Sequence, residues 1–439
     1  MPVANRPKTS LADYSSIQNN SIQQGISGNE AILVRDGVII RKVKMEDLAN
    51  QHRPVQVLSF DPSDLSYSWQ PLIELHRHEN THSLVRIRTR SGRETSVLAT
   101  HPFPSVDDDG NLVNIQGREL IPGRSLLLIP GTIPNTRAWS WVVVHEPVIG
   151  PKKGLQIDLP HALRLSTDLG FLFGRYLANG ASVDRQGAFY IASINEKLEH
   201  LTLSILSEIG THPHLDQGTI RVSSAQLARS LENDFGRIAA DKKIPGWTFG
   251  APVRFRMGLI DGFWSSGWIE PKGRIMQVQT YSRELAQDMQ AFLASIHVQT
   301  YLRERDYEYA SGKSRKQFRI EISSSGVGRM PVLSHPEKRA KQKKWVPPQK
   351  DMLDVAPIPK NLVKGKLRSK SEKGYGGVTF VTREATHPRH RRLLDSPILW
   401  DVVESVTEMP PQESVYSLTI DTSHSIALYL GITFSGCSS

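Results

Sequence analysis

The sequence is poor in cysteine and has neither a long apolar run nor a signal for export. Its 439 residues include one cysteine, Cys437, which excludes a disulfide-stabilised secreted scaffold and fits a reducing compartment. No run of about 18 apolar residues occurs, so no membrane-spanning helix is expected. The opening residues, MPVANRPKTSLADYSS, lack the apolar core of a signal peptide. We therefore expect an intracellular protein, either cytoplasmic or nuclear.

What the chain does contain is a basic, globular composition. Hydrophobic residues make up 38% and charged residues 22%, which is typical of soluble globular proteins, and the length allows two or three domains. The net charge of +10 and the pI of about 9.5 favour a polyanionic partner. We see no basic amphipathic helix with a strong apolar face, so nucleic acid is favoured over a membrane surface.

The first third of the chain has a sequence pattern that is typical of a β domain. Residues 1–24 are polar and aperiodic, which predicts a flexible leader. Residues 25–150 alternate short β-branched runs with turn residues, and Asp36-Gly37 and Ser91-Gly92 are typical of hairpin turns. We therefore predict an all-β region over 25–150.

The middle of the chain, residues 151–334, changes to an α/β pattern. LSTDLGFLFGRYLANGAS has apolar residues at helical spacing, and a strand-like segment and a second amphipathic helix follow it. The same order begins again at VRFRMGLIDGFWSSGWI, roughly 85 residues later. This repetition predicts an internally duplicated α/β domain.

After a basic segment, the last part of the chain again has a sequence pattern that is typical of β-strands. Residues 335–394 are rich in Lys, Pro and Gly, which fits either a solvated linker or a basic arm that contacts phosphates. Residues 395–436 again contain β-branched runs such as ILWDVVESV. We therefore predict a multidomain α+β protein in which one β domain is split by an inserted α/β domain.

The two β regions resemble the two halves of an intein. GISGNEAILVRDG near the start and VYSLTIDTSHSIALYLGITFSGC near the end carry this resemblance. It implies the compact β splicing domain called Hint, with host-protein remnants at 1–24 and 437–439. SGRETSVLATHPF is similar to the segment that places a histidine beside the upstream splice junction, so His101 would be that histidine. His424 would serve the downstream junction. The simpler alternative is that both are ordinary hydrogen-bonded histidines.

The resemblance also assigns the splicing residues, and several have been replaced. Splicing needs a nucleophile at the first intein residue, another nucleophile after the last residue, and an asparagine that cyclises. Cys437 falls at the downstream nucleophile, but the first position is Gly25. Ser435-Gly436 stands where the family usually has His-Asn, and Leu98 replaces the expected threonine. These replacements argue against complete self-splicing, whether they arose by decay, domestication or engineering.

The inserted region resembles the LAGLIDADG homing endonucleases. DLGFLFGRYLANGAS and FRMGLIDGFWSSGWI are similar to the paired helices of that family, and DKKIPGW matches a segment often found before the second helix. The resemblance implies helices packed through small residues, a concave saddle of strands that reads duplex DNA in the major groove, and two acids that hold Mg²⁺ or Mn²⁺. The glycines that we expect to allow this packing are Gly174, Gly180, Gly258 and Gly262.

The acids expected at the helix ends have also been replaced. Asn179 occupies the first acidic position, and either Phe263 or Ser266 occupies the second, depending on the alignment. Asp261 survives, although that position usually lies within the helix pair, so Asn179 and Asp261 are our candidate metal ligands. Asp184 and Glu270 are nearby acids whose orientation the sequence does not give. We predict that Asn179 lies close to Ser266 or Phe263.

A basic residue that supports the developing charge is also implied. Lys242 is our candidate, and Lys243 is the alternative. A solvated turn is the simpler interpretation of this pair.

Three functions follow from these resemblances. The first is an intein-derived LAGLIDADG homing endonuclease, a monomer that cuts duplex DNA at a long site but is impaired in cleavage and splicing. The second is a DNA-binding protein that has lost cleavage. The third is an inert splicing precursor whose partners are only its host segments.

Overall fold

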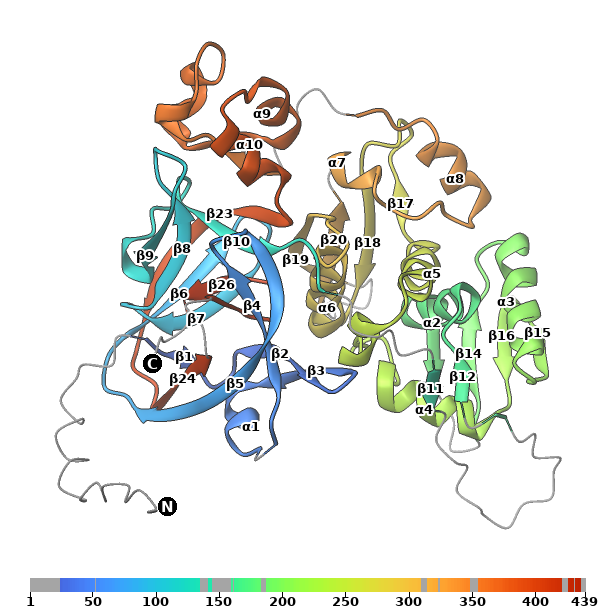
Figure 1. The fold of residues 1–439 in the computed structure, drawn as a ribbon. Coiled ribbons are helices and arrows are strands. Elements are labelled where there is room, and N and C mark those ends of the chain that lie inside the picture. Colours follow the sequence, from blue (N-terminus) through green and yellow to red (C-terminus); the bar gives the residue numbers. More distant parts are fainter. Residues whose placement is uncertain are drawn as a thin grey trace, which may run out of the picture.

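The computed structural model describes residues 24–51, 53–134, 141–143, 159–160, 162–182, 187–308, 314–322, 324–347, 354–420, 425–429 and 431–435. These residues form a β-rich domain beside a domain in which helices and strands alternate (Figure 1). Within them, every helix is too short or too polar to cross a membrane.

The β-rich domain is built around one extended sheet whose strands come from both ends of the chain. They are β1 (Ile26–Ser27), β2 (Ala31–Asp36), β3 (Ile39–Lys44), β4 (Gln56–Asp61), β5 (Ser66–Glu79), β6 (Leu84–Thr89), β7 (Glu94–Leu98), β10 (Leu126–Pro130), β21 (Val355–Pro357), β22 (Tyr375–Gly377), β23 (Ile398–Met409), β24 (Ser414–Ile420), β25 (Ser425–Ala427) and β26 (Thr433–Ser435). The hairpin β8 (Pro102–Val106) and β9 (Leu112–Gln116), the helix α1 (Met45–Ala49) and the 3-10 turn η2 (Gly117–Glu119) complete it.

Strand pairing joins the two terminal regions into one domain. β1 lies between β7 and β24, β23 pairs with both β6 and β10, and β25 pairs with β4. These pairings confirm the predicted fold class, an all-β domain split by an insertion. The hairpin turns at Asp36-Gly37 and Ser91-Gly92 are also confirmed, and Gly37 and Gly92 adopt the positive φ angles of +59° and +86° that suit glycine.

The inserted domain consists of two halves with the same order of elements. The first contains α2 (Thr167–Asn179), β13 (Gly180–Ser182), β14 (Phe189–Ala192), α3 (Glu196–Glu208), β15 (Pro213–Asp216), β16 (Thr219–Val222) and α4 (Ala225–Phe235). The second contains α5 (Val253–Trp264), β17 (Trp268–Ile269), β18 (Met276–Thr280), α6 (Arg283–Ala294), β19 (Thr300–Glu308), β20 (Ser314–Ile322) and α7 (Ser324–Val327). The sheets run β13-β14-β16-β15 and β17-β18-β20-β19, so each half repeats the topology of the other. The short pair β11 (Trp141–Val143) and β12 (Ala162–Arg164) precedes them, and the 3-10 turn η3 (Gly246–Gly250) links them.

The described part of residues 335–394 is folded, which corrects the prediction of a solvated linker. It contains α8 (Pro336–Gln342), β21, the 3-10 turns η4 (Lys360–Leu362) and η5 (Arg368–Lys373), β22, α9 (Val378–Glu384) and α10 (Pro388–Asp395). Val363 and Leu367, which lie among the lysines, are buried in a small core with Ile358 and Val381. The basic composition concealed this apolar spacing.

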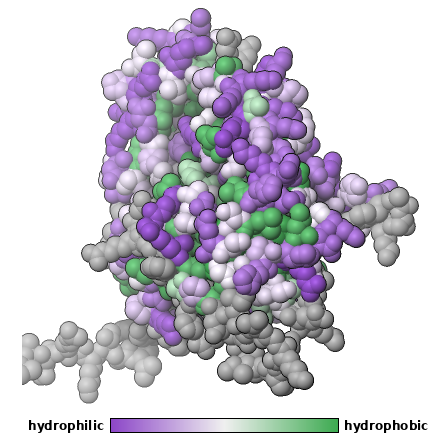
Figure 2. All heavy atoms as spheres, turned by 90° about the vertical axis from the view of Figure 1, so that its right-hand side faces the viewer, coloured by the Kyte–Doolittle hydropathy of each residue, from purple (hydrophilic) through white to green (hydrophobic). Residues whose placement is uncertain are grey.

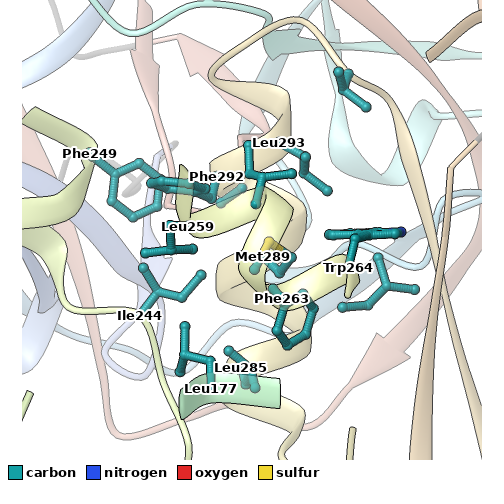
Figure 3. Packing of buried hydrophobic residues seen from close by; sticks show 14 of the residues in the cluster. Leu177, Ile244, Phe249, Leu259, Phe263, Trp264, Leu285, Met289, Phe292 and Leu293 are labelled. Atoms are coloured by element: carbon teal, nitrogen blue, oxygen red, sulfur yellow. The ribbon is translucent and has the colours of Figure 1, made fainter. Parts of the chain in front are cut away.

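The two domains share a continuous hydrophobic core. Figure 3 shows Phe249, Leu259, Met289 and Phe292 packed together where η3, α5 and α6 meet. Phe249 also contacts Tyr429 near the end of the β domain, with ring centroids 5.9 Å apart.

The face seen in Figure 2 is mostly hydrophilic, with scattered hydrophobic patches.

Candidate splicing centre and helix-end site

The predicted splicing histidine lies against the predicted first intein residue. The amide nitrogen of Gly25 donates a hydrogen bond to Nδ1 of His101 at 3.1 Å. Leu98 donates its amide to the carbonyl oxygen of Gly25 at 2.9 Å and accepts the amide of His101 at 2.9 Å. The turn after β7 therefore fixes the histidine beside Gly25, the predicted upstream junction.

His101 is buried and neutral at physiological pH. Burial lowers its pKa to about 3, and because Nδ1 accepts a hydrogen bond, the proton is on Nε2. The ring packs between Phe103 and Phe434, at centroid distances of 5.6 and 5.0 Å. Phe434 lies in β26 directly before Ser435, so the C-terminal strand approaches the same histidine as the upstream junction.

Apolar side chains occupy the space that a nucleophilic side chain at position 25 would need. A Cβ atom on Gly25 would lie 2.7 Å from Cγ2 of Val415 and 2.8 Å from Cδ1 of Leu98. Both side chains are fully buried and pack together. A larger side chain at position 25 therefore requires Leu98 and Val415 to move.

The side chains of the remaining predicted splicing residues lie outside the described part of the chain. His424, Gly436 and Cys437 lie outside the described residues, as do residues 1–23. The backbone of Ser435 pairs with Ser425 at the end of the β25–β26 ladder.

The two central helices of the inserted domain are in backbone contact. A Cβ atom at Gly170 would overlap the carbonyl oxygen of Phe255, and one at Gly258 would overlap that of Thr167. Gly174 and Gly262 have the same reciprocal relationship with Leu259 and Phe171. These reciprocal contacts relate α2 and α5 by a pseudo-twofold axis. Three predicted glycines lie on it, but Gly180 faces its own Tyr176, and the prediction missed Gly170.

A buried arginine joins the ends of these helices. Arg175 donates through Nη1 to Oδ1 of Asn179 at 3.4 Å and to Oγ of Ser265 at 2.9 Å, and through Nη2 to the carbonyl oxygen of Ala192 at 2.6 Å. Asn179 therefore shares a partner with the residue before Ser266. Phe263, the alternative, is buried in the apolar core beside Trp264 (Figure 3).

A second cation reaches the same place from α8. Nζ of Lys338 donates to the carbonyl oxygens of Ser265 and, at 3.4 Å, Trp264, and so caps the end of α5. Burial and the neighbouring Arg175 lower the pKa of Lys338 to about 8, and burial lowers that of Arg175 to about 10. No carboxylate in the described part of the chain pairs with Arg175.

Asp261 and Lys242 have other partners. Both oxygens of Asp261 accept hydrogen bonds from Ser334, from its amide at 2.7 Å and its hydroxyl at 2.6 Å. Lys242 is buried over the ring of Tyr176, with Nζ 3.2 Å from the centroid, and donates to the carbonyl oxygen of Gly236 at 3.0 Å.

These contacts bear on both catalytic assignments. Burial lowers the pKa of Lys242 to about 6, so its amine is largely neutral at pH 7. The neighbouring Lys243 is half-buried and donates its amide to the carbonyl oxygen of Phe235 at 3.1 Å. Lys242 and Asp261 thus make structural contacts rather than facing Asn179.

The described residues do not suit the expected Mg²⁺ or Mn²⁺. Hard divalent cations prefer several carboxylate or carbonyl oxygens. In the described ranges, no three His, Cys, Asp or Glu side chains cluster in a way that could hold a metal ion. Among the described residues, the groups at the helix ends are an amide, two hydroxyls and two cations. Arg175 and Lys338 were missed from the sequence; only the i,i+4 spacing of Arg175 and Asn179 on one helix could have indicated the first.

Comparison with known proteins places these features in context. A family model described as the intein splicing domain matches residues 32–432. DNA-directed RNA polymerase subunit Rpo1C of Methanocaldococcus jannaschii is 25% identical over 318 residues, which cover 64% of this chain and 37% of that protein. An iron-sulfur cluster assembly SufBD family protein of Mycobacterium leprae is 29% identical over 132 residues, covering 28% of this chain and 15% of that protein. The chain thus spans well under half the length of these curated relatives.

Two solved structures are also similar to parts of the chain. The transcription factor IIB Mvu mini-intein is 21% identical, covers 26% of this chain and 72% of that chain, and has a TM-score of 0.23. I-DmoI in complex with DNA and Ca is 15% identical, covers 36% and 84%, and has a TM-score of 0.27.

Proposed function

This chain belongs to the intein splicing domain family, and on that premise we propose that it is an intein-derived DNA-binding protein that completes neither splicing nor metal-dependent DNA cleavage. The observation that carries the proposal is the cationic pair Arg175 and Lys338 at the helix ends. A site with this charge repels divalent metal. The sequence alone ranked the impaired endonuclease first, whereas this geometry favours the binding protein.

One face of the β19–β20 hairpin supports binding to duplex DNA. In the antiparallel register Arg303 lies opposite Arg319, Arg305 opposite Gln317, and Tyr307 opposite Arg315. Side chains at directly opposite positions share a face, so this face carries four arginines. Arg319 pairs with Glu321 on this face, with Nε 3.9 Å from Oε2, so the positive charge comes mainly from Arg303, Arg305 and Arg315. A two-stranded ribbon fits the major groove. We assign this face, the arginine face, as the principal DNA contact.

The arginine face provides the test of DNA binding. Replacing Arg303, Arg305 and Arg315 by glutamine should weaken binding to a mixed-sequence duplex in EDTA by at least tenfold at about 50 mM salt. The control variant K44Q/R53Q/R77Q removes the same charge from the β domain near α1 and β5 and should bind like the wild type. Absence of wild-type binding at about 50 mM salt would overturn the proposal and leave the inert precursor.

The loss of splicing is supported by Gly25, which has no side chain to attack the preceding carbonyl, and by the glycine at 436. Intact-mass spectrometry tests it. The chain should keep its full mass for days with dithiothreitol or hydroxylamine. Fragments that end at Gln24 or begin at Cys437 would contradict the proposal.

A further inference from the structure

A second cationic surface lies outside the inserted domain. Between η4 and the end of η5 the chain carries one carboxylate, Glu372, and six exposed cationic side chains: Lys360, Lys364, Lys366, Arg368, Lys370 and Lys373. We call these six the η4–η5 cations. In the described ranges none of them forms an ion pair with a carboxylate; Lys370 only contacts the ring of Phe380, with Nζ 4.2 Å from the centroid. Cations therefore outnumber carboxylates six to one within this segment.

The backbone beneath the η4–η5 cations is folded. Val363 and Leu367 point into the small core with Ile358 and Val381, which turns the intervening cations outward. The cationic groups are thus presented by a fixed scaffold rather than by a flexible chain. Less conformational entropy is lost when such a scaffold binds.

This scaffold is also tied to the β domain. Asn361 donates its amide to the carbonyl oxygen of Asp108 at 2.8 Å and its side chain to Oδ1 of Asp109 at 2.9 Å. Nη2 of Arg90 donates to the hydroxyl of Tyr375 at 2.6 Å, and β21 pairs with β23 of the large sheet. Figure 1 shows α9 and α10 of this region above the large sheet, on the side away from α1.

The chemistry of the surface selects among polyanions. Within residues 354–395 no large hydrophobic side chain is exposed, so the apolar insertion that anchors proteins to membranes is missing. Tyr375 is buried and Phe380 is covered by Lys370 and Arg383, so no free ring is available to stack on single-stranded bases. Exposed cations without aromatic or apolar companions suit the regularly spaced phosphates of a duplex.

We propose that the η4–η5 cations form a second contact surface for duplex DNA, separate from the arginine face. This inference rests on the proposed function, because it takes duplex DNA as the partner. The contacts are to phosphates and carry no sequence preference, so they add affinity and salt dependence rather than specificity.

The salt dependence of binding tests the inference. The variant K364Q/K366Q/R368Q should lower the slope of log affinity against log salt by about 2 to 3 on a mixed-sequence duplex of about 40 bp, since each lost phosphate contact removes about 0.9. The variant K364R/K366R keeps the charge and should keep the wild-type slope. The control K44Q/R53Q/R77Q should also keep it.

The outcomes separate this inference from the proposed function. If the wild type binds duplex DNA and K364Q/K366Q/R368Q retains the full slope, the second surface is wrong and the arginine face stands. If the wild type does not bind duplex DNA, the proposed function fails as well. Equal loss of binding to single-stranded DNA, or binding of the wild type to phosphatidylserine vesicles that this variant abolishes, would also overturn the inference.

Discussion

Among single residues, His101 shows most clearly how burial determines the protonation state of a side chain. Its Nε2 atom has no hydrogen-bond partner in the described part of the chain, and its Nδ1 atom accepts the amide of Gly25. Protonation of Nδ1 would break its hydrogen bond with the amide of Gly25. It would also place a positive charge in an apolar site without water. The ring is therefore held neutral beside Gly25.

This burial predicts a pH dependence of stability. The folded pKa of about 3 lies below the unfolded value of about 6.5, so the unfolded state binds the proton first as the pH falls. The contribution of His101 to the free energy of unfolding is fully present above pH ~6.5 and is lost between pH ~6.5 and ~3. The loss amounts to about 2 kcal/mol by pH 5. Urea unfolding at pH 7 and pH 5 should show a smaller loss for His101→Gln than for the wild type. Equal losses would show that His101 is accessible to protons.

The packing over Gly25 predicts which changes restore the upstream reaction. Gly25→Cys alone should form little thioester, because Leu98 and Val415 occupy the space of the new side chain. Gly25→Cys with Leu98→Thr and Val415→Ala removes both obstructing side chains and should release a fragment ending at Gln24 when dithiothreitol is added, as mass spectrometry would detect. Equal release from the single variant would show that Leu98 does not block the site.

Asn179→Asp tests the charge at the helix ends. The new carboxylate would lie at the helix C-terminus, which is unfavourable by up to about 1 kcal/mol, but it would pair with the buried Arg175 for about 1–3 kcal/mol. We expect the melting temperature to rise by about 2 °C or more and to be unaffected by Mg²⁺. A rise that appears only with Mg²⁺ would instead indicate a working metal site, which Asn179→Ser should lack.

At the scale of elements, α2 and α5 depend on glycine more than on any polar contact. Gly258→Ala places a methyl group on the carbonyl oxygen of Thr167, a backbone atom that cannot move without separating the helices. We expect a loss of about 3 kcal/mol or more in the free energy of unfolding. The matched control is Gly25→Ala, where the new methyl meets movable side chains and the loss should be smaller. Equal losses in denaturant unfolding would contradict the backbone contact.

Elements with local signals could be predicted from the sequence. Apolar residues at helical spacing indicated α2, an apolar run that ends at glycine indicated α5, and the turn residues indicated the hairpins β2–β3 and β6–β7. Arg175 and Lys338 could not be predicted as a pair, because Lys338 reaches Ser265 across a separation of 73 residues from a segment that composition marked as a linker. A motif describes residues that are close in the sequence, so it does not reveal a pair that is formed only by such a long-range contact.

At the scale of the whole molecule, the two domains are joined by buried polar contacts. Nζ of Lys42 in β3 lies 2.9 Å from Oδ1 of Asp288 in α6, and the hydroxyl of Tyr429 donates to the same oxygen at 2.7 Å. A cleft of about 850 Å³ lined by charges of both signs adjoins these groups. Removing one partner of a buried ion pair is strongly destabilising, so the β domain and the inserted domain are held together as one body.

The central claim is that this body binds duplex DNA without cutting it. The most direct test is to incubate the protein with a pool of random-sequence duplexes in Mg²⁺, separate bound from free DNA, and sequence the strand ends in both fractions. We predict a bound fraction that is as large in EDTA as in Mg²⁺ and strands that remain intact. Strand ends enriched at one sequence in Mg²⁺ and absent in EDTA would contradict the claim and restore the endonuclease.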